Sequence, residues 1–215
     1  MQSRRPLKSR QRGWAITLAR LLARAGVSPN AISLASIGFA ALAGLALVLT
    51  SAAGATLQPL LWLVAAAGIQ LRLLCNLLDG MVAVEGGRGS KSGEVFNDAP
   101  DRLADAVILV AAGYALPWPE GGGALGWAAA LLAVLTAYVR LLGRALGLPQ
   151  DFCGPMAKQH RMAVLTVACL GAVAEGLLFG NRGWALGVGL AVIAVGSALT
   201  IGRRLVRLVR ALETS

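Results

Sequence analysis

The chain has 215 residues, of which 57% are hydrophobic and only 14% are charged. A water-soluble domain carries about 25% charged residues, so this composition excludes one and predicts a protein that crosses a membrane several times. Lys and Arg number 20 against 10 acidic residues, a formal net charge of +10. In a membrane protein such an excess indicates the cytoplasmic face and anionic lipid headgroups, so we expect membrane lipids and no nucleic acid as partners.

The N-terminal stretch, residues 1–25, predicts an amphipathic helix that lies on the cytoplasmic leaflet. It contains seven basic residues and no acidic one, and from Trp14 onward apolar residues recur at helical spacing. A secretory signal peptide is the alternative interpretation. Arg20 and Arg24 interrupt the apolar run, which argues against that alternative.

The remainder, residues 26–215, predicts a bundle of six transmembrane helices. Pro29 suits the first turn of a helix, so we place the first span at about 32–50. The other spans are predicted at about 58–84, 94–116, 123–145, 160–180 and 183–202. The expected fold class is all-α: one polytopic membrane domain over residues 1–215, with an interfacial helix before six spans.

The distribution of basic residues predicts the orientation of these spans. The loops on one side carry Arg182 as their only basic residue, whereas the last span ends among Arg203, Arg204, Arg207 and Arg210. Because basic residues concentrate on the cytoplasmic side, both termini are expected there. We expect the bacterial inner membrane.

Residues 76–105 place polar side chains within this apolar chain. Spacings of three and four residues put the members of two clusters on common helix faces, so two helix ends could bring their oxygens together. Oxygen ligands suit hard cations such as Mg²⁺, Mn²⁺ or Ca²⁺, and the Gly- and Ser-rich loop between the clusters can approach a phosphate. The polar residues are Asn76, Asp79, Asn97, Asp98, Asp101 and Asp105.

This stretch resembles the CDP-alcohol phosphotransferases, also called CDP-alcohol phosphatidyltransferases. Their signature is D-x-x-D-G-x-x-A-R, eight residues, then G-x-x-x-D-x-x-x-D, and its spacing fits the chain without a gap. Three positions depart from it, with Asn at two of the four Asp positions and Val at the Arg. The matching positions, in order, are Asn76, Asp79, Gly80, Ala83, Val84, Gly93, Asn97 and Asp101.

The resemblance implies a metal site and a catalytic base. In the family the four carboxylates hold two divalent ions, and the last Asp acts as the base on the acceptor hydroxyl, a role that falls here to Asp101. One or two Mg²⁺ or Mn²⁺ ions are therefore expected at Asn76, Asp79, Asn97 and Asp101. Asp98 is a candidate to restore the charge missing at Asn97. Since Asn offers only a neutral oxygen, metal binding is expected to be weaker.

The resemblance also implies the phosphate-binding residues. In place of the missing Arg at Val84, Arg88 or Lys91 in the loop are the candidates. The residues expected at the CDP group are thus Asp79, Gly80, Ala83, Arg88, Lys91 and Gly93. Lys158, His160 and Arg161 stand at the entry of the fifth span. They either bind the phosphate of the acceptor or of a lipid, or simply anchor the helix on the cytoplasmic side.

The predicted function is a metal-dependent transferase of phospholipid biosynthesis. It would move a substituted phosphate from a CDP-linked donor, expected to be CDP-diacylglycerol, to an alcohol acceptor with release of CMP. A homodimer is possible. One alternative is a pseudoenzyme or lipid-binding partner of the same fold, favoured by the two Asn substitutions. Another is a small transporter with a translocation site at Arg72 and the carboxylates, although no inverted halves are visible.

Overall fold

The computed structural model describes residues 13–85 and 93–214, except for the side chains of residues 85, 93, 94, 96 and 97. The described residues form seven helices and no strand, which confirms the all-α prediction. In chain order the helices are α1 Gly13–Arg24, α2 Pro29–Leu49, α3 Gln58–Glu85, α4 Gly93–Tyr114, α5 Gly122–Ala145, α6 Lys158–Phe179 and α7 Trp184–Glu213. Ser28 caps α2, because its Oγ accepts a hydrogen bond from the backbone N–H of Ala31 at 3.1 Å.

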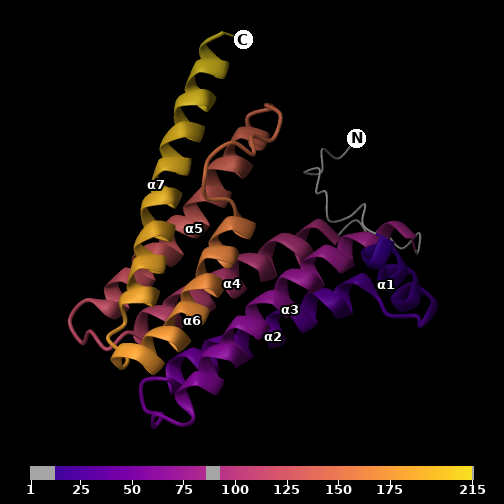
Figure 1. Cartoon of the computed structure of the whole chain (residues 1–215). Helices are drawn as coiled ribbons and strands as arrows, with labels where there is room; N and C mark the ends of the chain where they lie inside the picture. Colours follow the sequence, from indigo (N-terminus) through magenta and orange to yellow (C-terminus); the bar gives the residue numbers. More distant parts are fainter. Residues whose placement is uncertain (1–12, 86–92, 215) are drawn as a thin grey trace.

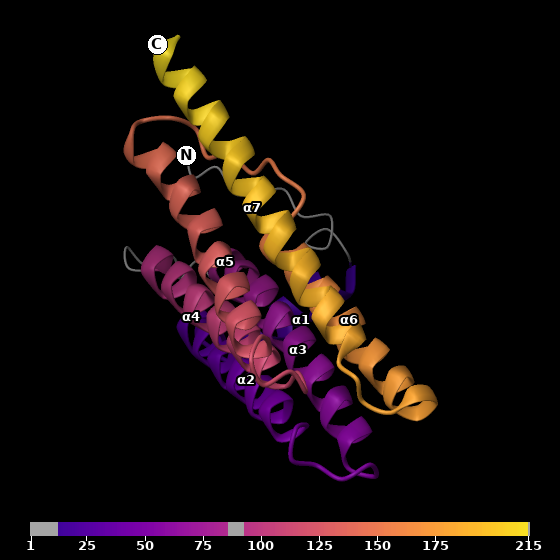
Figure 2. The same ribbon diagram turned by 90° about the vertical axis from the view of Figure 1, so that its left-hand side faces the viewer.

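The six long helices form a closed ring in which each packs against two neighbours (Figure 1; Figure 2). The order around the ring is α2, α3, α6, α7, α5 and α4, which returns to α2. α4 also contacts α3 and α7 across the ring. α4, which carries Asp98, Asp101 and Asp105, therefore contacts four other helices.

Five of the six long helices are long and apolar enough to cross a membrane: α2, α3 over Gln58–Val84, α5, α6 and α7. α4 differs because its N-terminal part, up to residue 105, carries Asp98, Asp101, Arg102 and Asp105. Charged side chains are tolerated at membrane depth where neighbouring helices bury and pair them. Crossing by α4 itself remains a prediction.

Close backbone contact between helices is visible where α4 meets α5. A Cβ atom added to Gly113 would lie 2.7 Å from the Cα atom of Gly126, so these positions admit only glycine without a shift of the helices. Small residues of this kind let helices pack tightly in lipid, where burial of apolar surface gives little driving force. The interior is filled by fully buried side chains such as Trp62, Ile69 and Ile108.

α1 packs along the end of α3 rather than standing alone (Figure 1). Ala15 and Ala19 are fully buried in a cluster that includes Leu78, whereas Trp14 and Leu21 are exposed. The predicted amphipathic helix is therefore present, over Gly13–Arg24. Its position at a lipid surface remains a prediction, and residues 1–12 lie outside the description.

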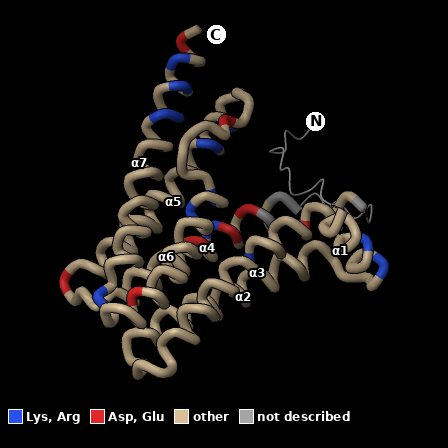
Figure 3. Tube along the Cα trace, viewed as in Figure 1, with Lys and Arg blue, Asp and Glu red and all other residues tan. Residues whose placement is uncertain are grey.

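One helix differs clearly from the sequence-based expectation in extent. α7 continues to Glu213, beyond the expected end of the last span at residue 202. α4 begins at Gly93, close to the predicted start at about residue 94, and contains Pro100. Figure 3 shows most of the basic residues toward the side of the bundle with α1 and the C terminus. This asymmetry agrees with the charge argument, while the orientation in a membrane remains a prediction.

Candidate active site

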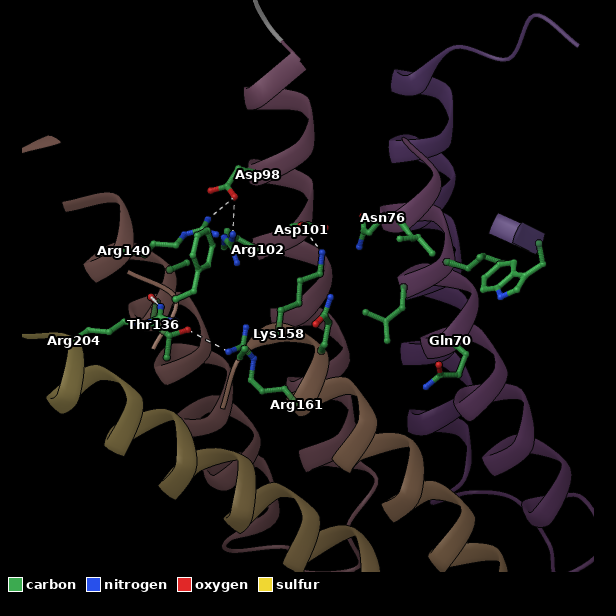
Figure 4. Close-up of a pocket in the computed structure, with 18 residues that line it drawn as sticks. Gln70, Asn76, Asp98, Asp101, Arg102, Thr136, Arg140, Lys158, Arg161 and Arg204 are labelled. Carbon is green, nitrogen blue, oxygen red and sulfur yellow. Dashed lines mark hydrogen bonds and ion pairs between the residues drawn. The ribbon is translucent and has the colours of Figure 1, made fainter. Parts of the chain in front are cut away.

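A pocket of about 470 Å³ lies in the charged part of the bundle (Figure 4). Its walls come from α1, α3, α4, α5, α6 and α7 and from the connection between α5 and α6. Five lining side chains are cationic and two are carboxylates, so an anionic ligand suits it. The charged lining residues are Asp98, Asp101, Arg102, Arg140, Lys158, Arg161 and Arg204.

Behind the pocket lies a buried ion-pair network centred on Asp105 of α4. Its Oδ1 lies 2.7 Å from Nη2 of Arg72, and its Oδ2 accepts a hydrogen bond of 2.9 Å from Nη2 of Arg161. All three residues are almost completely buried. A buried carboxylate between two guanidinium groups is compensated on both sides, and here it joins α3, α4 and α6.

Arg161 makes further contacts that fix it in place. Its Nη1 donates to the hydroxyl of Thr136 on α5 at 3.2 Å and to the carbonyl of Met156 at 3.1 Å. The residue predicted to hold an acceptor phosphate therefore lines the pocket and also connects α6 to α4 and α5. Both of its terminal nitrogens are already engaged by the protein.

Asp101, the candidate base, stands on the pocket wall, 7% exposed. Its Oδ2 accepts a hydrogen bond from the Lys158 ammonium group, and its Oδ1 lies 3.5 Å from Nη2 of Arg72. Arg72 also donates to the backbone carbonyl of Asp101 at 3.1 Å. Two cations from different helices thus orient the carboxylate of Asp101.

Asp98 lies one turn before Asp101 and is more exposed. Its Oδ1 accepts hydrogen bonds from Nη2 of Arg102 at 2.7 Å and from Nη2 of Arg140 at 3.0 Å. The Arg140 guanidinium in turn lies 5.8 Å from the centre of the Phe152 ring. Asp98 thus pairs with two arginines at the pocket. Its role as a metal ligand remains a prediction.

Asn76 and Asp79 have different surroundings although they are three residues apart on α3. Asp79 is buried, and its Oδ2 accepts a hydrogen bond of 2.8 Å from Ser33 of α2, while its Oδ1 accepts from the backbone N–H of Gly80. Asn76 lines the pocket, and its buried Nδ2 has no hydrogen-bond partner in the described part of the chain. In Figure 4, Asn76 lies across the pocket from Asp101 and Lys158.

These residues can be compared with what a divalent ion needs. Among the described residues no three His, Cys, Asp or Glu side chains come together as a metal site. Asn76, Asp79 and Asp101 remain as donors, and a carboxylate oxygen can accept more than one bond. An Asn76 amide turned by half a rotation would present its oxygen where the unpartnered Nδ2 now lies. Asn76 and Asp101 thus each turn an atom without a hydrogen-bond partner to the pocket and would hold one hard cation, with Asp79 one turn beyond Asn76 on α3.

Of the other predicted site residues, only some line the pocket. Gly80 and Ala83 lie in the last part of α3 and Gly93 begins α4, on either side of residues 86–92, which lie outside the description. Arg88, Lys91 and the side chain of Asn97 lie outside the described part of the chain. Lys158 lines the pocket, whereas His160 is exposed, its Nδ1 2.7 Å from the carbonyl of Pro155.

Sequence reasoning missed several residues of this site. Arg204 of α7 was interpreted only as a mark of the cytoplasmic side. It is buried, and it donates from Nη1 to the carbonyl of Thr136 at 2.6 Å and from Nε to that of Cys153 at 3.0 Å. Arg102 and Arg140 were not singled out at all. Arg140 had a usable signal, because an arginine in an otherwise apolar span is costly unless it has a function or a partner. Nothing local to Arg204 distinguished it from its basic neighbours.

Comparison with known proteins gives several phosphatidylinositol phosphate synthases and an inner membrane protein. No protein-family model matches the chain. A phosphatidylinositol phosphate synthase of Mycobacterium marinum is 31% identical over 203 residues, which is 87% of this chain and 76% of the relative. The enzyme of the same name from Mycolicibacterium smegmatis is 28% identical over 207 residues, 92% of this chain and 83% of the relative. The inner membrane protein YnbA of Escherichia coli is 28% identical over 64% of each chain.

Solved structures show the same fold. The phosphatidylinositol phosphate synthase of Mycobacterium tuberculosis with CDP-DAG bound superposes with a TM-score of 0.70 at 24% identity, covering 90% of this chain and 92% of that one. Its complex with manganese and citrate gives a TM-score of 0.70 at 23% identity, covering 90% and 88%. Given this fold, the motif spacing and a relative at 31% identity, the chain belongs to the CDP-alcohol phosphotransferase family, which includes the phosphatidylinositol phosphate synthases.

Proposed function

We propose that this protein is an integral membrane transferase that moves a substituted phosphate group from a CDP-linked lipid to an alcohol, with release of CMP. One observation carries the proposal: Asp101, at the last Asp position of the family motif, stands on the wall of a pocket rich in cationic side chains. The Mycobacterium tuberculosis relative has been solved with CDP-DAG, so CDP-diacylglycerol is the proposed donor.

The reaction follows from the charges around Asp101. The acceptor oxygen attacks the β-phosphorus of the donor, the bond from that phosphorus to the CMP oxygen breaks, and Asp101 takes the hydroxyl proton. Lys158 and Arg72 orient the carboxylate that receives the proton. The cations of the pocket stabilise the charge that develops on the diphosphate. A divalent ion held by Asn76, Asp79 and Asp101 would further neutralise that charge.

The excess of cations suggests what kind of alcohol is accepted. After Asp98 and Asp101 are paired, cationic side chains of the lining still exceed carboxylates, which favours an acceptor that carries its own phosphate. Lys158 and Arg161 were the predicted phosphate ligands, and Arg140 and Arg204 extend that surface. The relatives are named for making phosphatidylinositol phosphate, so we propose a phosphorylated polyol.

The pocket is lined by five cationic side chains, and the basic residues gather toward one side of the bundle (Figure 3). We therefore propose that the active site and both termini lie on the cytoplasmic side of a bacterial inner membrane. The relative from Escherichia coli is named as an inner membrane protein, which supports this location. A homodimer remains a prediction.

The test is a CMP-release assay on the full-length protein in lipid nanodiscs that contain CDP-diacylglycerol. Matched acceptors with and without a phosphate, such as inositol phosphate and inositol, are added with Mg²⁺ or Mn²⁺. We expect CMP only with the phosphorylated acceptors, and none from the Asp101→Asn variant. Binding of CDP-diacylglycerol without CMP release from any acceptor would reject the transferase and favour a lipid-binding pseudoenzyme, which the Asn at positions 76 and 97 also suggests.

A further inference from the structure

The contact between Lys158 and Asp101 bears on the metal ions of the site. The ammonium group of Lys158, at the first residue of α6, donates directly to Oδ2 of Asp101. In the family, the carboxylate at this position belongs to the set of four that holds two divalent ions. A carboxylate oxygen bonded to an ammonium group already has a cation beside it.

We propose that the Lys158 ammonium group takes the place of one of the two divalent ions, so that this protein binds one divalent ion per chain. The inference rests on the proposed function only in placing that ion beside a CDP-linked donor. It assigns to Lys158 a fixed positive charge at the reacting diphosphate, beyond any contact with an acceptor phosphate.

The charge balance of the site supports a single ion. Four carboxylates balance two divalent ions, but with Asn at position 76 the described motif positions keep only Asp79 and Asp101. Two negative charges balance one divalent ion. A second ion would add two positive charges beside Lys158 and the fully buried Arg72, where repulsion is poorly screened.

The neighbouring carboxylates do not relieve this imbalance. Asp105 is already shared between Arg72 and Arg161, at 2.7 and 2.9 Å. Asp98 is shared between two other arginines of the pocket, Arg102 and Arg140, at 2.7 and 3.0 Å. Each of these carboxylates is thus compensated by fixed cations of the protein.

The position of Lys158 favours its contact with Asp101. Its side chain is mostly buried, Arg72 contacts the same carboxylate, and Arg161 lines the same pocket. An ion that needed Oδ2 of Asp101 would have to drive the ammonium group toward these like charges. The remaining donors, Oδ1 of Asp101 with Asp79 and the Asn76 amide, suffice for one ion.

The test counts bound Mn²⁺ by electron paramagnetic resonance, on the full-length protein in nanodiscs without donor or acceptor. We expect one Mn²⁺ per chain for the wild type. Lys158→Gln should bind Mn²⁺ more tightly by about tenfold or more, because it removes a positive charge next to a ligand oxygen. Lys158→Arg keeps the charge and should behave as the wild type. Arg207→Gln removes a charge from an exposed residue outside the pocket lining and should leave binding unchanged.

Three outcomes would overturn the inference: no Mn²⁺ or two Mn²⁺ per wild-type chain, or the same Mn²⁺ affinity in Lys158→Gln and the wild type. If Lys158→Gln does not fold, Asn76→Asp tests the same point with Lys158 in place. That variant should bind its single ion more tightly, and a rise to two ions would reject the proposal.

The readout is separate from that of the proposed function. If the protein binds one Mn²⁺ but releases no CMP, this inference stands and the proposed activity is rejected. If the protein is active but binds two Mn²⁺, the proposed activity stands and this inference is rejected.

Discussion

Both ends of this apolar bundle bury carboxylates, but their partners differ. At one end Glu175 of α6, 7% exposed, accepts hydrogen bonds from three backbone N–H groups at the start of α7. Its Oε1 accepts from Arg182 at 2.9 Å and Trp184 at 3.1 Å, and its Oε2 accepts from Ala185 at 2.8 Å. These are the donors that a helix leaves unpaired at its N terminus, so Glu175 acts as a cap.

At the other end Asp101 is equally buried, yet its partners are side-chain cations on the wall of a pocket. Its Oδ1 makes no hydrogen bond within the described residues, and Nδ2 of Asn76 across the pocket is also without a partner. A carboxylate whose bonds are completed by backbone groups holds helices together. A carboxylate that has cationic partners on a cavity wall and an oxygen without a hydrogen bond can instead bind a ligand and react with it.

The largest effect should come from Asp101. Asp101→Asn keeps the size of the side chain but removes the base, so kcat for CMP release should fall by about 10²–10⁴-fold. Thermal unfolding should confirm that the variant is folded. Glu175→Gln serves as the control, with kcat unchanged. Equal losses in the two variants would remove the distinction between the two ends.

The next effect concerns the network behind the pocket. Arg161→Met leaves Asp105 with one of its two cations, which should lower the free energy of unfolding by about 3–5 kcal/mol. Denaturant titration in detergent measures the change. Adding Asp105→Asn to Arg161→Met should recover part of the loss, because the uncompensated charge is removed. A stable Arg161→Met with only a raised KM for the acceptor would instead make Arg161 purely a ligand of the phosphate.

A smaller change is expected at the opposite end. Glu175→Ala removes the acceptor for three backbone N–H groups and should lower the free energy of unfolding by about 1–3 kcal/mol. The kcat per folded molecule, measured by CMP release below the unfolding transition, should not change. A drop in kcat would mean that the cap of α7 is coupled to the pocket.

The smallest effect is expected at Asp98. The side chain is 31% exposed and its ion pairs with Arg102 and Arg140 are partly solvated. Asp98→Ala should therefore cost about 0.2–1 kcal/mol of stability. The freed arginines should lower the KM for a phosphorylated acceptor. A higher Mn²⁺ requirement at unchanged KM would show instead that Asp98 supplies the charge missing at Asn97.

The sequence by itself determined the helices and much of the polar surface of the site. Apolar runs of bilayer length predict where a chain crosses a membrane, which is why the helix ranges agree closely with the structure. The spacing of Asn76 and Asp79 predicted that they share one face of a helix, and Asp79 of that face is buried, as is Arg72 one turn before Asn76.

The partners of these residues were decided only by the tertiary structure. Asp79 pairs with Ser33 at a sequence separation of 46, Asp105 with Arg161 at 56, and Lys158 with Asp101 at 57. Periodicity shows which face of a helix is polar, but it does not contain the order of helices around the ring. That order depends on how all six helices pack, and it alone brings α6 beside α3 and gives α4 contacts with four other helices. The ammonium group at Asp101 is a consequence of that packing.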